Sequence, residues 1–277
     1  MKNCVLDKFS LKGKICVITG GAGLLGKKHA EAVLEAGGLP VILDINEESI
    51  HKTVSSLKKT YRKEVVGFKV DITNRVEMEV LRDIVLKKYK KIDVLINNAA
   101  NNPKIENKTK INWSRFENFP IQVWNNDLAV GLTGAFCASQ VFGTVMAKQK
   151  NGVILNISSD LGIIAPDQRI YTKPGLSINQ QPAKPVTYSV IKHGLIGLTK
   201  YLATYWVENN IRVNALCPGG VYNDQDEVFV KKLTNLIPMG RMAKVDEYKA
   251  TIIYLISDAS SYMTGSVVVV DGGRTCW

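Results

Sequence analysis

The sequence predicts an α/β protein built on a doubly wound parallel sheet, in a single domain that spans residues 1–277. Short apolar runs alternate with longer runs of helical period. The first apolar run leads directly into a glycine-rich turn. Several of the strands are apolar on both faces, as strands are when helices cover both sides of a parallel sheet. The length suits one large α/β domain and does not demand a second.

The N-terminal stretch predicts the unit that binds a dinucleotide. Ile15–Thr19 is a short apolar run typical of a β-strand, and residues 20–26, Gly-Gly-Ala-Gly-Leu-Leu-Gly, follow it directly. A helical stretch comes next and closes at two glycines, and residues 40–43 predict a second strand that ends on Asp44. Glycines let the backbone approach a pyrophosphate, and the helix N-terminus supplies N–H donors and positive potential. Strand, glycine turn, helix, strand and acid in this order indicate cofactor binding.

Asp44 bears on the choice of cofactor. It follows Thr19 by about 25 residues, where a carboxylate holds the hydroxyls of the adenosine ribose. The same charge repels a 2′-phosphate, and no arginine stands next to it. We therefore expect NAD(H) to be favoured over NADP(H).

The alternation of strands and helices then continues. Helices are expected over residues 47–59 and 75–89, and strands over residues 65–70 and 93–96. The last of these leads into the sequence Asn-Asn-Ala-Ala at residues 97–100. The expected apolar markers of the helix at 75–89 are Val76, Val80, Ile84 and Leu86.

A second pattern, Tyr188-Ser-Val-Ile-Lys192, begins a run of strong helical period. Side chains four apart on a helix share a face, so the phenol and the ammonium are expected to lie together. A neighbouring cation favours the phenolate and lowers its pKa, which suits a tyrosine that exchanges protons near neutral pH. Taken alone, the five residues are better explained by an ordinary helix with one tyrosine and one lysine on its solvent-exposed side, and only the other motifs of the chain favour the catalytic interpretation.

Together, the glycine turn, Asp44, Asp71, the Asn-Asn-Ala-Ala strand end and Tyr-x-x-x-Lys resemble the short-chain dehydrogenase/reductase family. Residues 154–159, 211–221 and 265–273 extend the resemblance, which covers the chain from about residue 11 to residue 273. It implies a Rossmann-like sheet of seven strands. It also implies an enzyme that transfers a hydride between a nicotinamide and an alcohol or carbonyl carbon.

The resemblance also implies roles for single residues. Ser159 would hydrogen-bond the substrate oxygen, Tyr188 would be the general acid in reduction and the base in oxidation, and Lys192 would lower the tyrosine pKa and hold the nicotinamide ribose. Tyr171 is not a rival to Tyr188, because position 175 is glycine rather than lysine. The cofactor-binding residues implied are Gly20, Gly23, Leu24, Leu25, Gly26, Asp44, Asp71, Ile72, Asn97, Ala99, Tyr188, Lys192, Pro218, Gly219 and Val221.

Three departures from the family pattern stand out. Gly131 takes the place of an asparagine that helps a water relay protons to the lysine. This keeps open an alternative, a cofactor-binding subunit or scaffold with weak or lost catalysis. Leu24 replaces a glycine of the turn, whose spacing is similar to that of the longer, sugar-nucleotide-modifying branch; the length of the chain and the motifs at residues 218–219 and 271–273 still resemble the shorter, single-domain branch. Ala100 replaces another glycine.

Two insertions, near residues 101–120 and 163–186, and a loop near 219–240 are expected on the substrate side. The loop carries Val228, Phe229 and Leu233 at the spacing of a short amphipathic helix. The second insertion is polar, and its Arg169 could clamp a carboxylate or phosphate. These insertions could equally cap the site or form an oligomer contact. Residues 21–26, 165–169 and 271–277 are similar to oxidoreductases of bacterial surface-sugar (nonulosonic acid, flagellin glycan) pathways, which favours a small, polar, sugar-like substrate.

Composition excludes several other classes. The net charge of +11 comes from lysines spread along the chain, so we expect a solvated surface rather than nucleic-acid binding. Five scattered cysteines and three histidines form no metal-binding pattern and indicate a reduced, cytoplasmic protein. No apolar run approaches the roughly eighteen residues of a membrane helix. By the resemblance, we expect a homodimer or homotetramer, with contacts near Tyr201, Trp206 and residues 267–270.

Overall fold

The structure is a computed structural model that describes residues 4–101 and 112–277. One parallel sheet of seven strands has the order β3-β2-β1-β4-β5-β6-β7, which confirms the predicted fold class. The strands are β1 (Ile15–Thr19), β2 (Leu39–Asp44), β3 (Val66–Lys69), β4 (Val94–Asn97), β5 (Gly152–Ile157), β6 (Ile211–Pro218) and β7 (Val267–Val270). The α-helices are α1 (Leu24–Glu35), α2 (Glu47–Tyr61), α3 (Arg75–Tyr89), α4 (Ile121–Leu128), α5 (Gly134–Gln149), α6 (Val186–Tyr205), α7 (Glu227–Thr234) and α8 (Lys249–Ile256).

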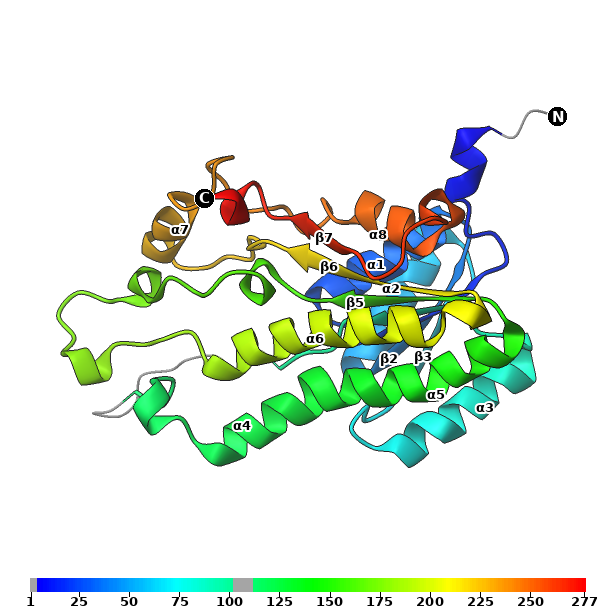
Figure 1. The fold of residues 1–277 in the computed structure, drawn as a ribbon, viewed down its shortest axis with the longest axis horizontal. Coiled ribbons are helices and arrows are strands. Elements are labelled where there is room, and N and C mark those ends of the chain that lie inside the picture. Colours follow the sequence, from blue (N-terminus) through cyan, green and yellow to red (C-terminus); the bar gives the residue numbers. More distant parts are fainter. Residues whose placement is uncertain (1–3, 102–111) are drawn as a thin grey trace.

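Helices cover both faces of the sheet (Figure 1). Helices α1, α2 and α8 contribute to the core on one face, and α3, α5 and α6 to the core on the other. Along β1 the side chains alternate between them: Ile15 and Val17 face α3, α5 and α6, while Cys16 and Ile18 face α1 and α8. Because both faces are buried, the strand must be apolar throughout.

The strand order reverses between β1 and β4. Strand β1 pairs with β2 on one side and with β4 on the other, all parallel. Crossovers therefore leave β1 and β4 in opposite directions, and a crevice opens beyond their carboxyl ends. This is the position in which the functional residues gather.

Helix α3 has the predicted bounds but packs on a different face. Met78, Leu81 and Val85 are buried against the sheet, whereas the predicted markers Val76 and Val80 are 67% and 55% exposed. The helix carries two apolar stripes, and the periodicity of the sequence does not tell which of them faces the sheet.

Two aromatic residues at the end of α6 were expected at a subunit contact. Trp206 instead belongs to the core, where its ring packs so closely on Gly143 that a β-carbon there would lie 2.4 Å from it. Tyr201 is 63% exposed and stacks on Tyr205, with 5.7 Å between the ring centroids. A role for Tyr201 at a subunit contact remains a prediction.

A single helical stretch runs from Ile121 to Gln149, because a π-helical turn at Ala129–Thr133 joins α4 to α5 without a break. Its 29 residues are long and apolar enough to cross a membrane by length and composition. Polar residues interrupt its apolar ones, so no continuous apolar run marks this stretch in the sequence. The stretch packs on α3, α6 and the sheet, as a core helix of a globular protein does.

The described parts of the two insertions pack on each other. Asn112 N donates to Asn179 O at 3.1 Å, Arg115 Nη1 to Ile178 O at 2.9 Å, and Ala183 N to Ser114 Oγ at 2.9 Å. Residues 102–111, with three lysines of the first insertion, lie outside the described residues.

The second insertion also contacts α7, the predicted amphipathic helix of the 219–240 loop. Tyr171 packs on Phe229 with 5.5 Å between ring centroids, and Lys232 Nζ donates to Thr172 O at 2.7 Å. The insertions and the loop thus form one layer beside the crevice.

Candidate active site

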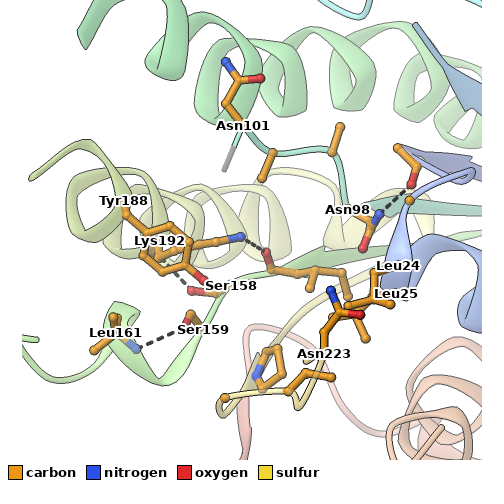
Figure 2. A pocket seen from close by; sticks show the side chains of 18 of the residues that line it. Leu24, Leu25, Asn98, Asn101, Ser158, Ser159, Leu161, Tyr188, Lys192 and Asn223 are labelled. Carbon is orange, nitrogen blue, oxygen red and sulfur yellow. Dashed lines mark hydrogen bonds between the residues drawn. The ribbon is translucent and has the colours of Figure 1, made fainter. Parts of the chain in front are cut away.

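A cavity of about 600 Å³ lies at the carboxyl ends of the strands. Figure 2 shows side chains from both ends of it, from the glycine turn to the tyrosine of α6. Most of the cofactor and catalytic residues implied by the family resemblance line it: Gly20, Gly23, Leu24, Leu25, Asp44, Asp71, Ile72, Ala99, Ser159, Tyr188, Lys192, Pro218, Gly219 and Val221.

The glycine turn forms a cradle at one end of the cavity. Gly20 has a φ of +60°, which favours glycine. A β-carbon on Gly26 would lie 2.1 Å from the carbonyl oxygen of Gly20, so only glycine lets α1 start this close to the turn. Helix α1 begins at Leu24 with no side-chain cap and no acidic residue in its first turn, which leaves its N–H groups for a ligand. This cradle fits a pyrophosphate.

Asp44 lies at the end of β2, on the rim of the same cavity. Its Oδ2 accepts from Ala22 N at 3.2 Å and its Oδ1 from Asn46 N at 3.1 Å. These bonds hold the carboxylate in place. Ile45, next in the chain, lines the cavity with an apolar side chain, so no cation is positioned there.

The two asparagines that follow Ile96 have different surroundings. Asn97 is 3% exposed, and its Nδ2 donates to Ser139 Oγ and Asn156 Oδ1 beneath the sheet edge, away from the cavity. Asn98 lines the cavity (Figure 2), and its Nδ2 donates to Thr19 O and Gly20 O at 3.1 and 3.0 Å. The structure therefore brings Asn98, rather than Asn97, to the cofactor side. Gly26, beneath the turn, is likewise outside the lining.

Ser159, Tyr188 and Lys192 come together at the other end of the cavity (Figure 2). The Ser159 side chain lies close enough to the Tyr188 hydroxyl to lower the pKa of that hydroxyl. Lys192 Nζ lies 5.6 Å from the centroid of the tyrosine ring and donates to Ile157 O at 2.8 Å. The serine hydroxyl donates to Asp160 Oδ1 at 2.6 Å and accepts from Leu161 N at 3.2 Å.

The electrostatics of the tyrosine differ from the expectation. Burial raises the pKa of Tyr188; the Ser159 side chain and the charge of Arg274 only partly oppose this, and the Asp160 charge adds to it. Burial, with a smaller effect of Lys184, lowers the pKa of Lys192 to about 8. On balance the pKa of Tyr188 is therefore raised rather than lowered in the protein alone, and the expected lowering effect of Lys192 remains a prediction. Its ammonium points to a backbone carbonyl, and Tyr188 is held as a proton donor.

Gly131 lies inside the π-helical turn and is packed against α6. A β-carbon there would lie 2.8 Å from Ile191 Cγ2 and 2.9 Å from Ile191 Cδ1. Ile191 thus fills the space that an asparagine side chain at this position would need.

We expect Gly131→Asn to destabilise the fold by about 1–3 kcal/mol, because it overpacks this contact. Urea or thermal unfolding followed by circular dichroism measures the change. Gly197→Asn, on α6, is the matched control, since a β-carbon there has no heavy atom within 4 Å. Equal unfolding midpoints for the two variants would contradict this expectation, because they would show that the Ile191 side chain moves aside without loss of stability.

Three further charged residues surround the tyrosine and were not predicted. Asp160 and Arg274 form an ion pair with 2.6 Å between Oδ2 and Nη1, and both side chains are buried. Lys184 Nζ lies 3.8 Å from the centroid of the Tyr188 ring. Arg274 stands near the C-terminus, which folds back beside α7 (Figure 1). No local motif indicates it, because the pairing depends on the strand order.

Arg169, the predicted substrate clamp, lies elsewhere. Its side chain is 88% exposed and paired with Asp167 at 2.7 Å, outside the lining of the cavity. Within residues 4–101 and 112–277, no three His, Cys, Asp or Glu side chains are placed to hold a metal ion.

Residues 21–275 match a family model described as "Enoyl-(Acyl carrier protein) reductase". The chain is 31% identical to post-translational flagellin modification protein A of Campylobacter coli, over 95% of this chain and 98% of that protein. It is 30% identical to an NAD-dependent glycerol dehydrogenase of Listeria innocua, over 96% of each. It is 32% identical to an NADP-dependent mannitol dehydrogenase of Alternaria alternata, over 96% of this chain and 94% of that protein.

Solved structures are similar over the whole length. A gluconate 5-dehydrogenase from Burkholderia cenocepacia, in complex with NADP and tartrate, has a TM-score of 0.85 at 26% identity and covers 99% of this chain and 100% of its own. An NAD⁺-bound xylitol dehydrogenase has a TM-score of 0.82 at 25% identity, with 95% of this chain and 99% of its own covered.

Proposed function

The chain belongs to the short-chain dehydrogenase/reductase family, and we propose that it is an NAD-dependent enzyme that interconverts an alcohol and a carbonyl in a small polar, sugar-like substrate. The observation that carries the proposal is the cavity itself. It has a pyrophosphate cradle at one end, and Ser159, Tyr188 and Lys192 at the other.

Each of the three side chains has a different role at the reacting oxygen of the substrate. A nicotinamide, when bound, supplies the acceptor or donor of the hydride. Tyr188 donates a proton to the substrate oxygen in reduction and takes it back in oxidation. Ser159 holds the same oxygen by a hydrogen bond. Lys192, fixed on Ile157 O, places its positive charge beside the tyrosine, where that charge opposes the effect of burial as phenolate forms.

The preference for NAD rests on Asp44 and Ile45. Relatives of the chain use either cofactor by their names, so the family alone does not decide. A carboxylate fixed by two backbone N–H groups accepts hydrogen bonds from ribose hydroxyls and repels a 2′-phosphate.

We expect Asp44→Ser with Ile45→Arg to shift the ratio of kcat/KM for NADH over NADPH by about 100-fold toward NADPH, since it removes a repulsion and adds a charge-assisted bond. Steady-state kinetics with both cofactors measure it. A wild-type enzyme that uses NADPH as well as NADH would contradict the assignment of Asp44.

The substrate class is supported by relatives and by the lining. Similar proteins are named for glycerol, mannitol, xylitol and gluconate, all polyhydroxylated. In this chain Asn101, Asn223 and Gln225 add hydrogen-bonding side chains to the cavity.

Oxidation of NADH by the purified protein with a panel of ketoses and keto-sugars tests the proposal. Turnover that depends on a keto-sugar supports it. Cofactor binding without turnover of any member of the panel would favour the alternative, a subunit that binds cofactor without catalysis, for which Gly131 is the only motivation.

A further inference from the structure

Two lysines flank the tyrosine, with the spacing Lys184-x-x-x-Tyr188-x-x-x-Lys192. Lys192 is engaged with Ile157 O. Lys184 precedes α6 by two residues and its backbone N–H donates to Gln168 Oε1 at 2.9 Å, which fixes this end of the insertion. Its ammonium lies over the ring of Tyr188, 3.8 Å from the centroid, and its side chain lines the cavity.

The Lys184 ammonium has no counterion in the part of the chain that the structure describes. The carboxylate nearest in the cavity, Asp160, is already shared between the Arg274 guanidinium and the Ser159 hydroxyl. Asp44 and Asp71 lie at the other end, where β2 and β3 finish. Burial, with a smaller effect of Arg274, lowers the pKa of Lys184 to about 8, against the weaker effect of Asp160. An anion beside Lys184 would relieve this cost.

We propose that the substrate carries a carboxylate close to its reacting carbon, and that Lys184 binds this carboxylate while the Arg274–Asp160 pair borders it. The inference rests on the proposed function, because it specifies the substrate of that same site. Since the ammonium lies over the Tyr188 ring, a carboxylate that touches it is only a few bonds from the oxygen that Tyr188 protonates. The substrate class is therefore a short hydroxy or keto acid with further hydroxyl groups, such as a sugar acid.

The charge count favours a carboxylate over a phosphate. The Arg274–Asp160 pair is neutral as a whole, and Lys192 lies beside the tyrosine, so among the described residues one positive charge remains unmatched at Lys184. A carboxylate carries one negative charge, whereas a phosphate monoester carries about 1.5 to 2 near pH 7.

The test compares three five-carbon ligands, of which one is neutral, one carries a carboxylate and one carries a phosphate ester. Calorimetric titration of the full-length protein, saturated with NADH, is carried out with xylitol, xylonate and xylitol 5-phosphate. We expect xylonate to bind about 10- to 100-fold more tightly than xylitol, as a charge-assisted hydrogen bond predicts. Equal affinities of xylonate and xylitol would overturn the proposal, and so would a clear preference for the phosphate ester.

Substitutions of Lys184 test whether this residue causes the preference for xylonate. Lys184→Met is expected to abolish the preference for xylonate and leave the affinity for xylitol within about 2-fold, while Lys184→Arg retains most of it. Lys173→Met is the matched control, since Lys173 is exposed on the same insertion and does not line the cavity. A preference that survives Lys184→Met with an unchanged melting temperature would overturn the assignment. Because binding is measured without turnover, a preference for xylonate in a protein that does not oxidise NADH would refute the proposed function and keep the anion site.

Discussion

Tyr188→Phe is expected to lower kcat by about 10²- to 10⁴-fold, the usual contribution of a positioned acid or base. The hydroxyl is the one group of Tyr188 that can exchange a proton with the substrate oxygen, and it lies beside Ser159 in the cavity. The ring remains, so its contact with the Lys184 ammonium is preserved. Steady-state turnover of NADH with the most active keto-sugar of the panel measures the loss.

Binding must be measured beside the rate, because Tyr188 is also expected to contact the cofactor. We expect the Kd for NADH, from fluorescence titration, to change by no more than about 10-fold, the equivalent of one hydrogen bond. Tyr205→Phe is the matched control, since it removes an exposed hydroxyl from the same helix. Unchanged kcat in Tyr188→Phe would mean that another group moves the proton, and the assignment would be withdrawn.

Only part of the fold that positions these residues could be predicted from the sequence. Up to β4 the order of strands and helices followed from apolar periodicity, whereas the later strands were expected from the family resemblance. Strand β1 has the predicted bounds because a fully buried strand is apolar throughout. The face of α3 did not follow, since the sequence offers two apolar stripes and only the packed sheet selects Met78, Leu81 and Val85.

In the candidate active site too, some contacts could be predicted from the sequence and others could not. Tyr188 and Lys192 are one helical turn apart in the sequence, so their proximity could be predicted. Asp160 and Arg274 are separated by 114 positions and meet only because β5, β6 and β7 are neighbours in the sheet. The direction of the Tyr188 pKa shift could not be predicted either. It is set mainly by burial, which the sequence does not reveal.

The Asp160–Arg274 pair is the second feature with a large expected effect. It joins the turn after β5 to the segment after β7, and both side chains are nearly inaccessible, at 4% and 6%. Asp160 Oδ1 also accepts hydrogen bonds from Ser159 Oγ and Leu161 N, so the pair helps to fix the position of the Ser159 side chain. A buried pair of this kind adds little net stability, but the removal of one partner leaves a charge without compensation.

We therefore expect Asp160→Leu to lower the free energy of unfolding by about 3–5 kcal/mol. The double variant, with Arg274→Met added, should recover most of the loss, because both charges are then absent from the interior. Chemical denaturation of the four proteins of this cycle measures the coupling. Asp167→Leu is the control: it breaks the exposed pair with Arg169, and exposed pairs contribute little.

Activity separates the stabilising role of the pair from its role in positioning Ser159. The double variant should refold yet keep a reduced kcat, since the Ser159 hydroxyl has lost its acceptor and is free to rotate toward other partners. Full recovery of both stability and kcat would show that Asp160 only balances the charge of Arg274. A double variant as unstable as Asp160→Leu would instead show that the Asp160 hydrogen bonds, rather than the charge of Arg274, determine the loss. The expected outcome, recovery of stability without recovery of rate, assigns Asp160 as the residue that positions the serine.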